Sequence, residues 1–160
     1  YEITTKPLSV VIIKKDINFN LGYFLDKLAY SVRHIAIYKI DNVKYFKIDF
    51  EVDDMDKYLL DEVIADSFLE HNEYKFVNPT IKWENFTLDC NHSKNYLALK
   101  LKMRDKKGII ANVMQMMDRY KIDVEDIKIS LEKGVVRDIL IINKNSNFCE
   151  IYEQFLEEFR

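Results

Sequence analysis

Apolar and polar positions follow the same layout twice along this chain, at an offset of 88 positions, the distance from Leu21 to Ile109. In each copy an apolar run leads through a short polar turn into a helical pattern, and the two patterns begin at these two residues. Both place apolar residues at steps 0, 4, 7 and 11, which lie on one face of an α-helix. A repeat of this size predicts two copies of one small domain.

The periodicity within each copy predicts strands and helices in the same order. In the first copy we expect strands at 8–14, 34–40, 45–52 and 80–88, and helices at 21–33 and 57–71. In the second copy we expect strands at 96–103, 124–131 and 135–142, and helices at 109–120 and 147–159. Three local signals support these bounds: Asn20 as a helix cap, the acidic residues Asp53, Asp54 and Asp56 at a helix start, and Lys133-Gly134 as a hairpin turn.

The strand order βαββαβ is that of a ferredoxin-like fold. We therefore predict an α+β protein with two ferredoxin-like units in tandem, with antiparallel sheets and helices on one face. Unit 1 should cover residues 7–88 and unit 2 residues 94–160. In unit 1 the strand at 80–88 should return beside the first strand. In unit 2 the fourth strand is absent or lies beyond the chain end, which would leave a sheet edge open to another chain.

Composition narrows the partners and the compartment. The formal net charge is −3 and the hydrophobic share is 48%, which favours a globular chain and disfavours nucleic acid or an anionic membrane as partner. No apolar run approaches the roughly 18 residues that cross a bilayer, and no signal-peptide pattern opens the chain, so we predict a cytoplasmic location. Cys90 and Cys149 lie far apart and predict neither a disulfide framework nor a metal site.

Three segments carry a family resemblance: Arg-Asp-Lys-Lys-Gly-Ile-Ile at 104–110, Ile-Asp-Val at 122–124 and Val-Arg-Asp-Ile-Leu-Ile-Ile at 136–142. With them, residues 97–142 resemble the ACT domain, a regulatory module that binds small ligands, often amino acids. The family's usual turn reads Asp-Arg-Pro-Gly-Leu-Leu, and here Lys106 and Lys107 replace Arg-Pro.

The segment at 81–85 and the Val-x-Asp at 136–138 are similar to the C-terminal tandem of ACT domains in PII uridylyltransferase/uridylyl-removing enzymes. This resemblance implies a region that senses glutamine, that regulates nucleotidyltransferase and hydrolase domains preceding it, and whose parent enzyme modifies the PII signal protein. The chain itself shows no phosphate-binding glycine loop and no Cys/His nucleophile pair. We therefore expect no catalytic residue, metal or cofactor within it.

The turn at 104–110 is the expected ligand site. A turn from a strand into a helix offers backbone N–H groups and a positive dipole end to a carboxylate. Asp105 suits an ammonium group, and Gly108 lets the backbone come close. The candidate ligand-binding residues are Arg104, Asp105, Lys107, Gly108, Ile109 and Ile110. The alternative is that Asp105 only caps the helix and Gly108 only permits the turn.

The first copy lacks this turn chemistry. At the 88-position offset Ile17 stands for Asp105 and Asn20 for Gly108, with Asp16 one position away. We expect this turn to have lost its ligand contacts, so that unit 1 serves mainly as a structural partner.

Two other functions stay open. The tandem could be a ligand-free interaction or dimerisation module that pairs through sheet edges with preceding domains or a second copy. It could also be a stand-alone ACT regulator of another amino-acid pathway. His34, His71 and His92 are isolated in the sequence and predict no metal site.

Overall fold

The computed structural model describes residues 2–5, 8–14, 19–28, 30, 32–41, 43–51, 55–69 and 79–160. The first half, residues 2–69, contains β1 (Glu2–Thr5), β2 (Leu8–Lys14), α1 (Leu21–Leu28), β3 (Val32–Ile40), β4 (Val43–Phe50) and α2 (Lys57–Asp66). The second half, residues 79–160, contains the 3-10 turn η1 (Trp83–Asn85), β5 (Phe86–Asp89), β6 (Tyr96–Arg104), α3 (Ile109–Arg119), β7 (Val124–Glu132), β8 (Val135–Asn143) and α4 (Phe148–Glu157).

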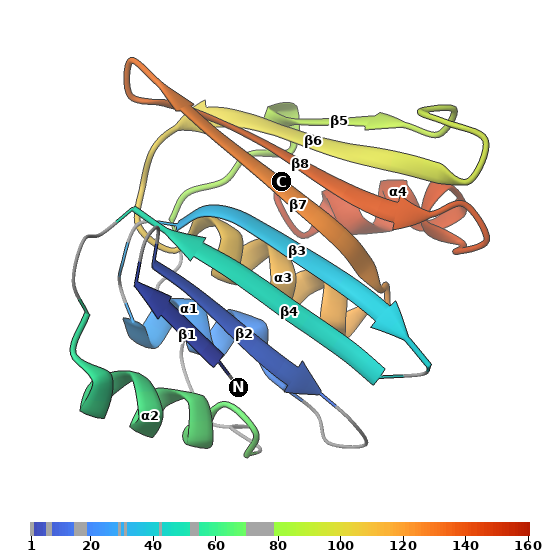
Figure 1. Ribbon diagram of the computed structural model, residues 1–160. Coiled ribbons are helices and arrows are strands. Elements are labelled where there is room, and N and C mark those ends of the chain that lie inside the picture. The colour runs from blue at the N-terminus through green and yellow to red at the C-terminus, as the bar shows by residue number, and fades with distance from the viewer. Residues whose placement is uncertain are drawn as a thin grey trace.

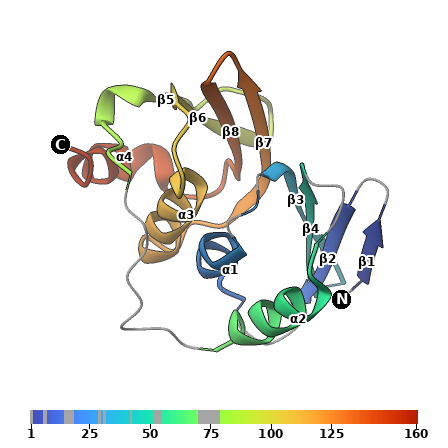
Figure 2. The ribbon, with the colours of Figure 1, turned by 90° about the vertical axis from the view of Figure 1, so that its left-hand side faces the viewer.

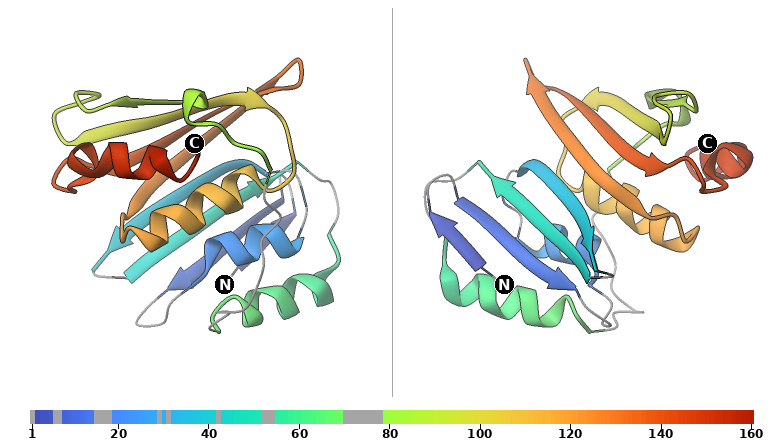
Figure 3. Two further views of the ribbon diagram at one scale, coloured as in Figure 1. Left: turned by 180° about the vertical axis from the view of Figure 1, so that it is seen from behind. Right: turned by 45° about the vertical axis from the view of Figure 1, so that its right-hand side comes forward.

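The strands form one eight-stranded sheet in the order β1-β2-β4-β3-β7-β8-β6-β5, and every neighbouring pair is antiparallel. The halves join where β3 pairs with β7, at His34↔Lys128, Ile35↔Ile127 and Ala36↔Asp126. The helices lie on one face of this sheet (Figures 1 and 2). In the reverse view, this helical face is turned toward the viewer (Figure 3, left). The prediction of an α+β fold with an antiparallel sheet and helices on one face is confirmed.

One hydrophobic core runs through both halves. Inward-facing residues of the central strands, such as Ile48 on β4 and Leu140 on β8, are fully buried, and so are apolar residues of the helices, such as Phe24 and Val113. The helices α1 and α3 pack against each other across the β3–β7 junction. The two halves therefore share a core, to which both α1 and α3 contribute.

The local signals act as their chemistry predicts. The Tyr23 N–H donates to Asn20 Oδ1 at 2.9 Å, and the Tyr58 and Leu59 N–H groups donate to Asp56 Oδ1 at 2.9 and 3.2 Å. Lys133 and Gly134 form the β7–β8 turn with φ of 51° and 77°, the left-handed geometry of a tight hairpin.

Two helices, α1 and α2, end earlier than the sequence predicts. Helix α1 ends at Leu28 instead of residue 33, because β3 already begins at Val32 and pairs with Phe50 of β4. Helix α2 ends at Asp66 with Ser67 as its C-cap. Part of the predicted helix at 57–71, with His71, lies outside the described residues, as do Asp53 and Asp54.

The prediction that the strand at 80–88 returns beside the first strand of its unit is wrong. Residues 83–85 form η1, and only 86–89 are extended; this strand, β5, pairs with β6 at Phe86↔Leu101 through Asp89↔Ala98. A short hairpin connection to β6 replaces a long return to β2, in keeping with the tendency of consecutive strands to be neighbours. The position beside β2 is taken by β1, with Glu2↔Val11 and Thr5↔Leu8.

The second half is therefore not missing an edge strand. The sheet position outside β6 was predicted to be empty. It is filled by β5, which precedes β6 in the chain. Each half has the order strand, strand, helix, strand, strand, helix, and its edge strand comes first in the chain.

The expectation that Cys90 and Cys149 form no disulfide is also wrong. The two are disulfide-bonded, with their Cα atoms 6.3 Å apart and 59 positions apart in sequence. Cys90 directly follows β5 and Cys149 lies in the first turn of α4. The fold brings these ends together: the Lys144 N–H donates to Asn95 O at 2.8 Å, tying the segment before α4 to the β5–β6 loop.

Candidate functional site

The turn between β6 and α3 has an unusual backbone geometry at one position. Gly108 is the N-cap of α3 and has φ 88°, ψ 7°, the left-handed region that side chains other than glycine rarely adopt. At the other end of the turn, the Asp105 N–H donates to Gly134 O of the β7–β8 hairpin at 2.8 Å. The hairpin and the glycine together fix the path of residues 105–108.

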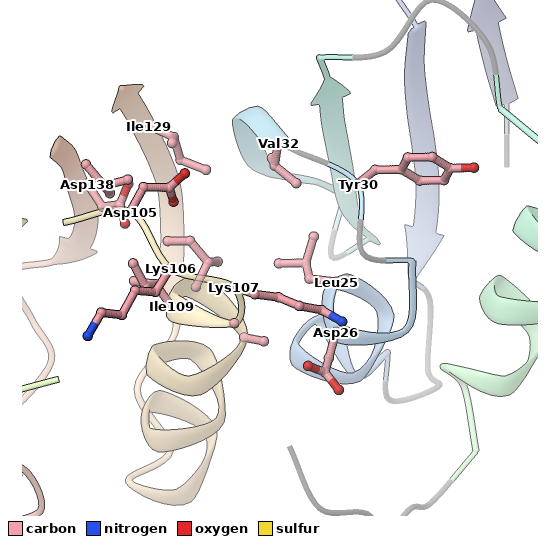
Figure 4. A pocket seen from close by; sticks show the side chains of 14 residues that line it. Leu25, Asp26, Tyr30, Val32, Asp105, Lys106, Lys107, Ile109, Ile129 and Asp138 are labelled. Atoms are coloured by element: carbon pink, nitrogen blue, oxygen red, sulfur yellow. The ribbon is translucent and has the colours of Figure 1, made fainter. Parts of the chain in front are cut away.

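A cavity of about 380 Å³ lies between this turn and the first half of the chain. The first half contributes Leu25 and Asp26 from α1, together with Tyr30 and Val32 beside the start of β3. The second half contributes the turn and first helical residues from Asp105 to Ala111, with Ile129, Val136 and Asp138 from β7 and β8. Figure 4 shows the two sides facing one another across the cavity. The site is therefore built from both halves.

Five of the six candidate ligand-binding residues line the cavity: Asp105, Lys107, Gly108, Ile109 and Ile110. Arg104, the last residue of β6, is exposed and is not among the lining residues. Lys107 extends from the turn toward Asp26 of α1, and Lys106 points away from α1 (Figure 4). Lys106 lines the cavity although it was not among the candidates.

The helix N-terminus opens onto the cavity. The first helical hydrogen bond of α3 runs from the Asn112 N–H to Gly108 O at 3.0 Å, so the N–H groups of the preceding first turn face outward from the helix end. The N-cap residue Gly108 makes no side-chain cap hydrogen bond at this end. The Asp105 carboxylate lies beside Asp138 (Figure 4), and both interpretations of Asp105, ligand contact and helix cap, stay predictions.

Asp138 is the most unusual group of the site. It is 1% exposed, and within the described part of the chain neither carboxylate oxygen has a hydrogen-bond partner. Its cross-strand neighbours are the apolar Leu101 on β6 and Ile129 on β7. Burial, and secondarily the nearby Asp105, raises the pKa of Asp138 from 3.8 to about 7, because both effects disfavour the charged form.

Asp138 is the last residue of the Val-x-Asp segment at 136–138, but it is not among the ligand-binding residues predicted from the sequence. The signal was present in the strand pattern. Val136, Leu140 and Ile142 are inward-facing and buried, and Asp138 occupies the same face at the same two-residue spacing. A carboxylate at an inward position, next to a candidate turn, marks a site more directly than the turn alone.

The loss of ligand contacts at the corresponding turn of the first half stays a prediction. Asp16 and Ile17 lie outside the described residues, and the Asn20 side chain is engaged as the cap of α1. His34 lies at the β3–β7 junction, with Nε2 3.2 Å from Asp126 Oδ1 and Nδ1 3.8 Å from Asp49 Oδ2. Its contacts tie three strands together. Nowhere in the described ranges do three or more His, Cys, Asp or Glu side chains gather to hold a metal.

No protein-family model, curated protein or solved structure matches this chain. Among the described helices, none is long and apolar enough to cross a membrane.

Proposed function

We propose that this chain is a regulatory module of two ACT-like, ferredoxin-like units and that it binds a small amino acid in the cavity between them. One observation carries the proposal: the turn singled out by the sequence lies against α1 of the other half, and the two enclose a cavity with a buried carboxylate. Such a cavity offers a carboxylate for an ammonium group and helix N–H groups for a carboxylate.

The sheet order supports the ferredoxin-like assignment. In the predicted βαββαβ unit the first and third strands are central, the second strand is at one edge and the fourth at the other. Here β2-β4-β3 and β6-β8-β7 follow the first-third-second order, and β1 and β5 occupy the places of the fourth strands. These two strands hold the sheet positions of the fourth strands, although each is the first strand of its half in the chain.

The binding site suggests how the module acts. A ligand changes a conformational balance only if it binds one arrangement better than another. Because Leu25 and Val32 belong to one half and Asp105 and Ile109 to the other, a bound amino acid would favour the arrangement in which the halves are closed on each other.

Glutamine as ligand, and a parent PII uridylyltransferase whose catalytic domains the module regulates, follow from the sequence resemblance alone. The cytoplasmic location stays a prediction as well. The Cys90–Cys149 disulfide weighs against it, since disulfides persist mainly in oxidising compartments.

A ligand-free interaction module is the less favoured function. Two sequence features favour it, the weak motif of the first unit and an open edge in the second half, and β5 covers that edge. The two outer strands, β1 and β5, have four residues each, and short edge strands are poor templates for pairing with another chain.

Thermal unfolding with a panel of the twenty amino acids tests the proposal. An amino acid at about 100 times its Kd adds about 2.7 kcal/mol to the free energy of unfolding, which raises Tm by roughly 5–10 °C in a chain of this size. A rise with glutamine alone would support both the sensor and the enzyme family. A rise with another amino acid keeps the sensor and removes glutamine.

Paired variants locate the binding. Asp105→Ala should abolish the rise in Tm without unfolding the chain, because it removes a carboxylate from the cavity. Asp61→Ala, on the exposed side of α2, removes the same group elsewhere and should keep the full rise. If no amino acid changes Tm in the unmodified chain, the sensor proposal is wrong.

A further inference from the structure

Asp138 and Asp105 form a pair of carboxylates at one wall of the cavity (Figure 4). Asp138 is buried between apolar cross-strand neighbours, and its oxygens accept no hydrogen bond from any described residue. Asp105 is exposed. A buried carboxylate without donors is costly in its charged form, so the empty cavity favours the protonated form of Asp138.

The other charged groups at the cavity do not neutralise Asp138. Lys107 extends toward Asp26, and Lys106 points away from α1 (Figure 4); neither donates a hydrogen bond to Asp138. Tyr30 and Asp26 line the opposite, first-half side. The same first-half side contributes the apolar Leu25 and Val32, and Ile129 lies beside Asp138 on the second-half side.

We propose that the Asp105–Asp138 pair is the subsite for a primary ammonium group of the ligand, and that entry of this ammonium releases one proton from the pair to solvent. This inference rests on the proposed function and extends it from the exposed Asp105 to the buried Asp138. The balance is simple: the ligand keeps its ammonium protons, the neutral carboxyl of the pair becomes a carboxylate, and its proton leaves to the buffer.

A primary ammonium fits better than other cations. It is compact and has three donors, which matches two carboxylates that can both accept. A divalent metal prefers six or more oxygen ligands, and in the described residues no cluster of three candidate ligands exists. Leu25 and Val32 on the opposite side suit the aliphatic part of an amino acid.

Proton release makes the affinity depend on pH with a definite sign. Below about pH 7, where the pKa of Asp138 lies, the empty site is protonated and binding must displace the proton. The Kd should therefore fall about tenfold for each pH unit from pH 5 to 7 and then level off. If the site bound the protonated pair instead, the Kd would stay level up to about pH 7 and rise above it.

Isothermal titration calorimetry with the full chain measures both effects. The probes are L-glutamine and L-leucine, each beside the same molecule without its amino group, glutaramate and isocaproate. Titrations at pH 6 in two buffers of different ionisation enthalpy count the protons released. We expect close to one proton released per amino acid bound. The Kd of the deaminated probes should not fall as the pH rises.

The variant Asp138→Asn keeps the shape of the side chain and removes its charge. It should bind the amino acid with a Kd that is flat between pH 5 and 7 and release no proton, while Asp61→Asn should behave like the unmodified chain. Binding of an amino acid without proton release would overturn this inference and leave amino-acid sensing standing, and so would equal binding of its deaminated analogue. Stabilisation by MgCl₂ or CaCl₂ with no response to any amino acid would overturn both. Failure of every amino acid in the panel at pH 8 would overturn both.

Discussion

Replacing Asp138 by Asn should stabilise the empty protein, and more so as the pH rises. The pKa of Asp138 is about 7 in the folded chain and ordinarily 3.8. Because the folded state holds a proton that the unfolded state has released, stability falls as the pH rises through this interval and stays low above it. At about 1.4 kcal/mol per pH unit, the full penalty is about 4 kcal/mol above pH 7, of which about 3 kcal/mol develops between pH 5 and pH 8.

Urea unfolding of the Asp138→Asn variant and the unmodified chain at pH 5, 6, 7 and 8 measures this difference. The gap in free energy of unfolding should widen in favour of the variant by about 3 kcal/mol across the series. Asp61→Asn, which removes an exposed carboxylate, should give a small and constant gap. A constant gap for Asp138→Asn, or one that narrows as the pH rises, would refute the argument that this carboxylate is buried without donors.

Three further changes test the scaffold around the site, each by chemical or thermal unfolding. Gly134→Ala should cost about 1 kcal/mol because φ at this position is 77°, and Gly134→Asn, which tolerates this region, should cost less; equal costs would contradict the backbone argument. Asn20→Ala should cost about 1 kcal/mol through the lost cap of α1, while Asn20→Asp should cost little. Reducing the Cys90–Cys149 bond, which spans 59 positions, should cost about 4 kcal/mol, and the double Ser variant should unfold like the reduced chain and ignore reductant.

The elements with strong periodicity were predictable. The alternation of Phe46, Ile48 and Phe50 and the helical spacing from Ile109 report burial on one face, and the structure places both against the core. Turn chemistry was equally informative, since Asn20, Asp56 and Gly134 act on their own neighbours in sequence. These signals are local, and local backbone geometry decides them.

Partnerships across the fold were not predictable in the same way. The periodicity of residues 86–89 does not say whether they pair with β2 or β6; the short connection to β6 decides it. The sequence does not indicate that Cys90 and Cys149 are close, because they are 59 positions apart and meet only when β5 and α4 pack together. The turn at 105–108 was found from its composition, whereas Asp26 and Leu25 enter the site only because α1 packs on α3.

The placement of the edge strands has a consequence for the order of folding. In each half the three strand pairs come from one contiguous stretch of chain, and two of the three join consecutive strands. The β3–β7 pairing is different: His34 and Asp126, which are bonded across it, are 92 positions apart. Because distant contacts form slowly, we expect each half to form before the junction closes. The cavity exists only after that closure, so a bound amino acid would slow unfolding and leave the rate of folding unchanged.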